Sequence, residues 1–119
     1  MQEYDKLLAN LISIASEAFR FRQVFEKAIE KLDYDEQRKY FSQYSWFSKR
    51  VMKALENSGL RMLNFEGHPY DPGMAISPLN LDEFEPEDKL YISRMVEPVI
   101  MKDDTVMKLG TVILGREEN

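Results

Sequence analysis

The side chains able to do chemistry are few in this sequence and form no recognisable catalytic set. His68 is the only histidine, which excludes a two-histidine metal site and a histidine relay. Ser77 and Ser93 lie in no Gly-x-Ser-x-Gly elbow, and the glycines fit neither the dinucleotide-binding nor the phosphate-loop pattern. We therefore expect no catalytic residue, no cofactor and no enzyme. An active site assembled in space from distant carboxylates stays open as the weakest alternative.

Carboxylates gather most densely in the segment 81–88, which also contains Pro86. Their spacing, without a central glycine, does not match an EF-hand calcium loop. The segment is most simply a solvated loop, and we expect no metal site there.

Composition narrows the class of partner. The chain has a net charge of −5 and no basic stripe, so a nucleic-acid partner is disfavoured. It contains no cysteine, which excludes disulfides and thiolate metal sites and fits a reducing cytoplasm. The first residues lack the pattern of a signal peptide, and no apolar run approaches the ~20 residues of a membrane helix. These features predict a cytoplasmic protein without a membrane-spanning segment.

The first half of the chain reads as two helices. Apolar residues at alternating spacings of three and four run from Tyr4 to Leu32, with a second row of Leu8, Ile12, Ala15, Phe19 and Ile29 beside them. Asp33 and Glu36 have the capping-box spacing that starts a second helix, and Gly59 stands where a left-handed residue would end it. Two helices joined by so short a turn must form an antiparallel hairpin.

The apolar faces of these helices are broader than one hairpin can cover, and an uncovered apolar face usually marks an interface. We therefore expect a homodimer joined through a four-helix bundle, although the residues leave open whether the core lies within one chain or between two. The predicted interface residues share the apolar helix faces: Leu11, Ile14, Phe21, Phe25, Tyr44, Phe47 and Val51.

The second half reads as short strands and turns. Alternation predicts strands over 61–66 and 89–96, the latter with Ile92 and Met95 on opposite faces. The proline and glycine cluster at 67–73 predicts turns. A polar turn at 102–105 predicts a hairpin between 99–101 and 106–114, or several short strands of a compact β-domain. Gly110 marks a bulge or a close backbone approach. The predicted fold is α+β: a helical hairpin domain over 1–59 and a small β-rich wing domain over 60–119.

The order of these parts, with two motifs, resembles the GrpE family of nucleotide exchange factors for DnaK-type chaperones. The helix end Leu55-Glu56-Asn57-Ser58-Gly59 is similar to that family's Leu-Glu-x-x-Gly pattern. The turn Gly67-His68-Pro69-Tyr70-Asp71-Pro72 resembles its Gly-x-x-Phe-Asp-Pro, with Tyr70 in the aromatic place. The segment 106–114 looks like the family's closing strand.

The resemblance implies a homodimer whose β-wing binds the ATPase domain of a DnaK-type chaperone and promotes ADP release by opening the nucleotide cleft. Carried over by position, the chaperone-binding residues are Tyr70, Pro72, Val96 and Leu114. This chain differs from the family in lacking the long leading coiled-coil helix and in carrying Asp103, Asp104 and Thr105 in the wing hairpin. These differences motivate an alternative, a dimeric adaptor or scaffold of the same fold without exchange activity.

Overall fold

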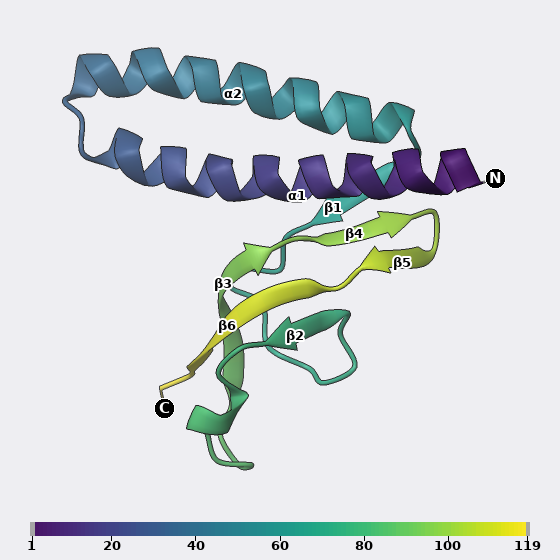
Figure 1. Ribbon diagram of the computed structural model, residues 1–119. Coiled ribbons are helices and arrows are strands. Elements are labelled where there is room, and N and C mark those ends of the chain that lie inside the picture. The colour runs from purple at the N-terminus through teal and green to yellow at the C-terminus, as the bar shows by residue number, and fades with distance from the viewer. Residues whose placement is uncertain (1, 119) are drawn as a thin grey trace. The chain divides into compact units, whose positions relative to one another are not determined.

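The computed structural model describes residues 2–118, which form two helices followed by short strands (Figure 1). The chain divides between Arg61 and Met62 into two compact units. This division falls inside strand β1 (Leu60–Leu63), whereas the sequence predicted a boundary between residues 59 and 60. The α+β class is confirmed, with helices in the first unit and two small, mostly antiparallel sheets after them.

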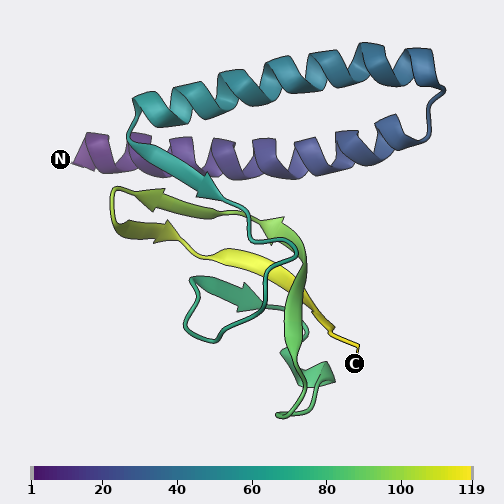
Figure 2. The same cartoon turned by 180° about the vertical axis from the view of Figure 1, so that it is seen from behind.

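Helices α1 (Gln2–Glu30) and α2 (Tyr34–Asn57) form the antiparallel hairpin that the sequence predicted (Figures 1 and 2). The Asp33 side chain accepts a hydrogen bond of 2.9 Å from the Glu36 backbone N–H, so Asp33 caps α2. Gly59 has φ of 75°, the left-handed conformation in which a helix commonly ends. Local sequence signals therefore set both ends of α2.

Aromatic side chains hold the two helices together. The Phe25 ring lies 6.3 Å from that of Tyr40 and 6.4 Å from that of Tyr44, measured between ring centroids. At the turn, the Gln37 amide donates to the Glu30 carbonyl oxygen over 3.4 Å. Offset and edge-on aromatic pairs of this kind each add about 0.5–1.5 kcal/mol to the apolar burial.

Strands β2 (Ile76–Pro78), β3 (Leu90–Glu97), β4 (Val99–Lys102), β5 (Thr105–Lys108) and β6 (Gly110–Arg116) follow. They form two three-stranded sheets with the orders β1-β4-β5 and β2-β6-β3. Within the second sheet β6 is central, parallel to β2 and antiparallel to β3. The sequence had not predicted β2, which is only three residues long and contains Pro78.

The predicted hairpin is confirmed and is longer than expected. Strands β3 and β4 follow one another across the buried Pro98, and β5 and β6 return antiparallel beside them after a turn at Asp103 and Asp104 (Figure 1). Asp103 adopts φ of 54°, a conformation that aspartate tolerates better than most residues. One folded-back ribbon thus supplies strands to both sheets.

Ile92 and Met95, which the sequence predicted on opposite faces of one strand, are both fully buried. The pairing of β3 with β6 shifts register between Ile92 and Arg94 and again between Met95 and Glu97. A β-bulge adds one residue to a strand and so reverses the faces that follow it. Met95 therefore joins the core of the second unit, whose other fully buried members include Val99, Ile100 and Val112.

Across residues 2–118, neither helix combines the length and the hydropathy that crossing a membrane requires.

Candidate functional site

The turn that carries the family-like motif is fixed along the edge of β3. Gly67 donates its backbone N–H to the Ile92 carbonyl oxygen at 2.7 Å, and Tyr70 donates to Leu90 at 2.9 Å. The Ile92 N–H in turn donates to the His68 carbonyl oxygen at 2.8 Å. Gly67 has φ of 87°, which glycine adopts without the steric cost that a side chain would add. These bonds fix the backbone of the turn at Tyr70, two residues before Pro72.

The acidic segment after β2 is ordered by hydrogen bonds, which the sequence-based prediction of a solvated loop missed. Asn80 bonds both backbone groups of Leu114, donating from Nδ2 to the carbonyl oxygen at 3.0 Å and accepting the N–H at 2.9 Å. A 3-10 helix, η1 (Leu81–Glu83), follows. The Asp88 carboxylate then accepts the Glu85 N–H at 2.9 Å and closes the loop.

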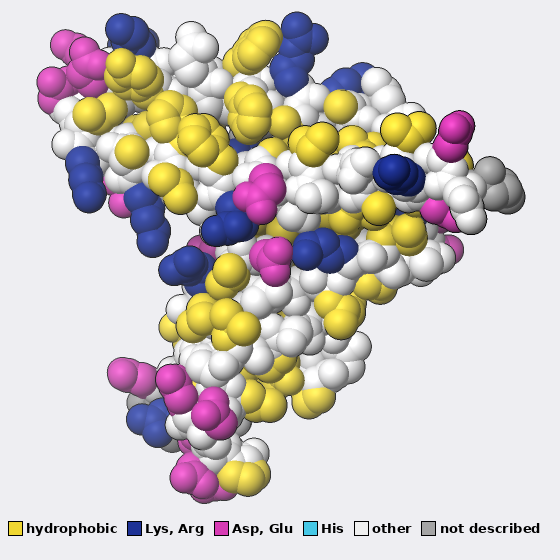
Figure 3. Space-filling view, in the orientation of Figure 1, with side chains coloured by type: hydrophobic (Ala, Val, Ile, Leu, Met, Phe, Trp, Pro, Cys, Tyr) yellow, Lys and Arg dark blue, Asp and Glu magenta, His cyan; other side chains and the backbone are white. Residues whose placement is uncertain are grey.

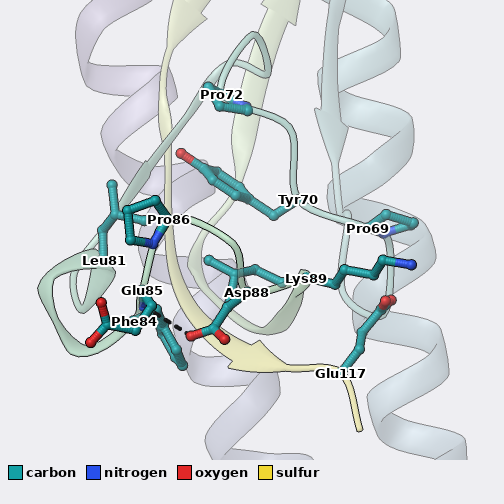
Figure 4. A pocket seen from close by; sticks show the side chains of 11 residues that line it. Pro69, Tyr70, Pro72, Leu81, Phe84, Glu85, Pro86, Asp88, Lys89 and Glu117 are labelled. Atoms are coloured by element: carbon teal, nitrogen blue, oxygen red, sulfur yellow. Dashed lines mark hydrogen bonds between the residues drawn. The ribbon is translucent and has the colours of Figure 1, made fainter. Parts of the chain in front are cut away.

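Between this loop and the turn lies a groove of about 640 Å³. Its turn side consists of Pro69, Tyr70 and Pro72, and Leu90 of β3 also lines it. The loop contributes the apolar side chains of Leu81, Phe84 and Pro86. In Figure 4, Tyr70 lies between the turn that carries Pro72 and the loop that carries Leu81 and Pro86. Two segments of the second unit thus build an apolar groove with an aromatic residue from each.

Charged side chains complete the groove. Glu85 and Asp88 come from the loop, and the backbone N–H of Glu117 donates to the Lys89 carbonyl oxygen at 2.8 Å, which places these two residues side by side. Three carboxylates and one ammonium group therefore border the apolar lining. Among the described residues, no three acidic or histidine side chains gather closely enough to hold a metal ion.

The predicted chaperone-binding residues lie in different environments. Pro72 is exposed and Tyr70 half-buried, and both line the groove. Val96 is half-buried on β3. Leu114 is only 3% exposed and packs in the core, so its side chain is not available for a direct contact in this arrangement. The structure thus brings two of the four predicted residues to one surface feature.

Sequence reasoning missed Leu81 and Phe84 as groove residues. The signal available was two apolar residues three apart within a run of carboxylates; Leu81 begins η1, and Phe84 is the residue that caps its carboxyl end. The high charge of the segment favoured the prediction of a solvated loop over this apolar signal.

A second surface runs along the helical unit, where hydrophobic side chains gather over both helices (Figure 3). Of the predicted dimer-interface residues, Ile14 (67%), Phe21 (60%) and Phe47 (37%) are exposed. The other four are half-buried: Leu11, Phe25, Tyr44 and Val51. Much of the predicted interface is therefore uncovered within one chain.

Four stacked or tilted rings cross this surface from α1 to α2: Phe21, Phe25, Tyr44 and Phe41. Successive ring centroids are 5.9, 6.4 and 5.8 Å apart. Phe41 at its end is 58% exposed. We call these four residues the aromatic row. They form a continuous apolar ridge with one exposed phenylalanine at each end.

Tyr44 in this row also belongs to a polar cluster. Its hydroxyl group donates to the Glu26 carboxylate, and Arg22 donates to the same hydroxyl over 3.5 Å. Burial raises the pKa of Tyr44 above its usual value, the hydrogen bond to Glu26 raises it further, and Arg22 acts in the opposite direction. The folded hairpin therefore favours the protonated phenol.

The raised pKa of Tyr44 predicts a loss of stability in alkali. The stabilisation linked to this group is present below the unfolded pKa of about 10 and is lost as the pH rises through the higher folded pKa. In Tyr44→Phe, the unfolding free energy should fall less between about pH 9 and pH 11. Urea unfolding measured across that range tests this, with the exposed Tyr34→Phe as the matched control. An equal pH dependence in all three proteins would contradict the assignment.

Comparison of the chain with protein-family models, with curated proteins and with solved structures finds no match in any of the three.

Proposed function

We propose that this chain is a GrpE-like co-chaperone, a homodimeric nucleotide exchange factor for a DnaK-type chaperone. The helical hairpins pair into a four-helix bundle, and the second unit binds the chaperone's ATPase domain. Binding favours the conformation with an open nucleotide cleft, so ADP leaves faster. The protein performs no chemistry, because its effect comes from binding one conformation of the partner more tightly than another.

The observation that carries the proposal is the Gly67–Pro72 turn, whose sequence resembles the family motif and whose backbone is fixed along β3. The order of the units, helical hairpin and then β-rich part, supports it. The aromatic row, whose end residues Phe21 and Phe41 are exposed, supports the dimer, since apolar surface of this kind is commonly buried by association.

The experiment measures ADP binding to a DnaK-type ATPase domain with and without this protein. Typical couplings between two ligands change affinity by roughly 5- to 150-fold, and we expect ADP affinity to fall within that range at saturating protein. By linkage, ADP must weaken binding of this protein to the ATPase domain by the same factor. Stopped-flow release of a fluorescent ADP should accelerate in parallel.

Tyr70→Ala should reduce binding to the ATPase domain, and Val96→Asp should do the same if β3 contributes to the contact. The control is Tyr34→Ala, which removes an exposed aromatic ring from the helical unit. Unchanged ADP affinity, together with no detectable complex, would refute the proposal.

A complex that forms without faster ADP release would instead support the adaptor of the same fold. The acidic turn at Asp103 and Asp104, which is exposed at the tip of the β4–β5 hairpin, favours that alternative.

A further inference from the structure

The groove beside Tyr70 has a chemical character that the exchange proposal leaves unexplained. Its apolar lining includes an aromatic ring from each wall, Tyr70 and Phe84, and its volume of about 640 Å³ lies within the range of ligand-binding clefts. The three prolines around it restrict the backbone of both walls. The groove is thus a constrained apolar surface, and its occupant must offer apolar groups.

The charge around the groove is strongly negative. The lining contains Glu85, Asp88 and Glu117 against Lys89 alone. The loop adds three more carboxylates, Asp82, Glu83 and Glu87. Figure 3 shows acidic side chains gathered at the end of the second unit where this loop lies. A cluster of one sign attracts ligands of the opposite sign and repels anions.

We propose that this groove binds an extended peptide segment in which an apolar residue or proline stands next to arginine or lysine. An arginine side chain matches both parts of the site, because its methylene stem is apolar and its guanidinium group is cationic. The guanidinium can pair with the Glu85 or Glu117 carboxylate, and it can also lie over the Tyr70 or Phe84 ring. Aromatic-lined grooves recognise extended, proline-containing segments in many proteins.

The inference goes beyond nucleotide exchange, because it concerns which peptides the second unit recognises. It does not depend on a chaperone being the partner. The peptide experiment below contains no nucleotide and no ATPase domain, so its failure and the failure of the exchange proposal are separately visible.

The test uses fluorescence anisotropy of a short labelled peptide that repeats proline, leucine and arginine. One matched peptide carries glutamate in place of arginine, and a second carries serine in place of leucine. We expect the arginine peptide to bind and each matched peptide to bind at least about tenfold more weakly. Binding should also weaken between about 0.1 M and 1 M salt, because the screening length falls from about 10 Å to about 3 Å. Equal affinity for the arginine and glutamate peptides would overturn the proposal.

Variants locate the binding at the groove. Glu85→Lys combined with Glu117→Lys reverses two exposed charges and should weaken the arginine peptide roughly tenfold, since each exposed pair contributes modestly. The control combines Glu3→Lys with Glu56→Lys, the same change in net charge on exposed residues of the helical unit. Equal weakening by both double variants would show a net-charge effect only and would overturn the assignment to the groove.

Phe84→Ser removes an apolar side chain from the groove wall. Phe84→Leu is the control, because leucine keeps an apolar side chain at this position. We expect the serine variant to lose binding and the leucine variant to keep most of it, with thermal unfolding recorded for both. If a folded Phe84→Ser protein binds the arginine peptide with wild-type affinity, the groove is not the binding site.

Discussion

Phe21→Asp is expected to convert the proposed dimer into a monomer at micromolar concentration. Phe21 is 60% exposed in the single chain and stacks on Phe25 at the α1 end of the aromatic row. In a four-helix bundle this ridge would be covered by the partner, and a carboxylate there would be buried without a counter-ion. Such a charge costs several kcal/mol, on the order of 3–5, which exceeds what a modest dimer interface can lose.

Sedimentation velocity provides the measurement, and circular dichroism shows whether the helices persist. Ser13→Asp is the matched control, since it places the same charge at an exposed polar position of α1. A wild-type protein that sediments as a monomer with folded helices would contradict the dimer. So would a Phe21→Asp protein that dimerises as tightly as the Ser13→Asp protein.

Gly110→Ala is expected to destabilise the second unit by about 1–3 kcal/mol, the usual cost of inserting a methyl group into a filled core. A Cβ atom at Gly110 would lie 2.9 Å from Val99 Cγ2, 3.0 Å from Met95 Cε and 3.2 Å from the Glu97 carbonyl oxygen. The methionine terminus can move aside, but the branched Val99 side chain and the backbone oxygen cannot do so cheaply. The close backbone approach predicted at this glycine is confirmed.

Gly73→Ala is the matched control, because its new Cβ atom would lie 3.5 Å from the Asp71 carboxylate, an ordinary contact distance. Urea unfolding of both variants gives the comparison. If the two alanines cost the same free energy, the crowding around Gly110 does not determine its effect.

The helical unit could be predicted closely from the sequence because its signals are local. The Asp33 cap and the Gly59 stop depend on neighbouring residues only, and the spacing of apolar residues identifies both helices. The sequence did not show which of the two apolar rows of α1 would be buried. Ala15, Phe19 and Ile29, from the row taken as secondary, are buried, whereas Ile14 and Phe21 from the first row are exposed. Burial depends on what packs against a face, which periodicity does not specify.

The sheets were less predictable because their pairing is not local. Strand β2 is three residues long, and it forms because Ile76–Pro78 pairs with the distant segment 110–112 of β6. The bulges of β3 depend on the register with β6, and they turned Met95 inward against the simple alternation. Alternation identifies a strand, but a single extra residue reverses its faces.

The candidate site was predicted in part. The turn around Tyr70 was identified from its motif, but the opposite wall of the groove was taken for solvated loop. Asn80 explains the difference, since its side chain bonds both backbone groups of Leu114 and thereby attaches the loop to β6. Asn80 thus makes hydrogen bonds to β6 that a neighbouring strand would otherwise make. The amino-acid composition of the segment does not reveal such a role for a single side chain.

The central position of β6 also determines when the protein can fold. Strands β2 and β3 both pair with β6, which is synthesised after them. During synthesis, the edges of β2 and β3 that pair with β6 therefore stay unpaired until residues 110–116 have been added. The two helices of the hairpin follow one another in the sequence and precede the sheets, so the hairpin can form before β6 has been synthesised. In the proposed dimer, two nascent chains would therefore meet through their helices while their sheets are still incomplete. In that interval the unpaired edges of β2 and β3 are open to aggregation.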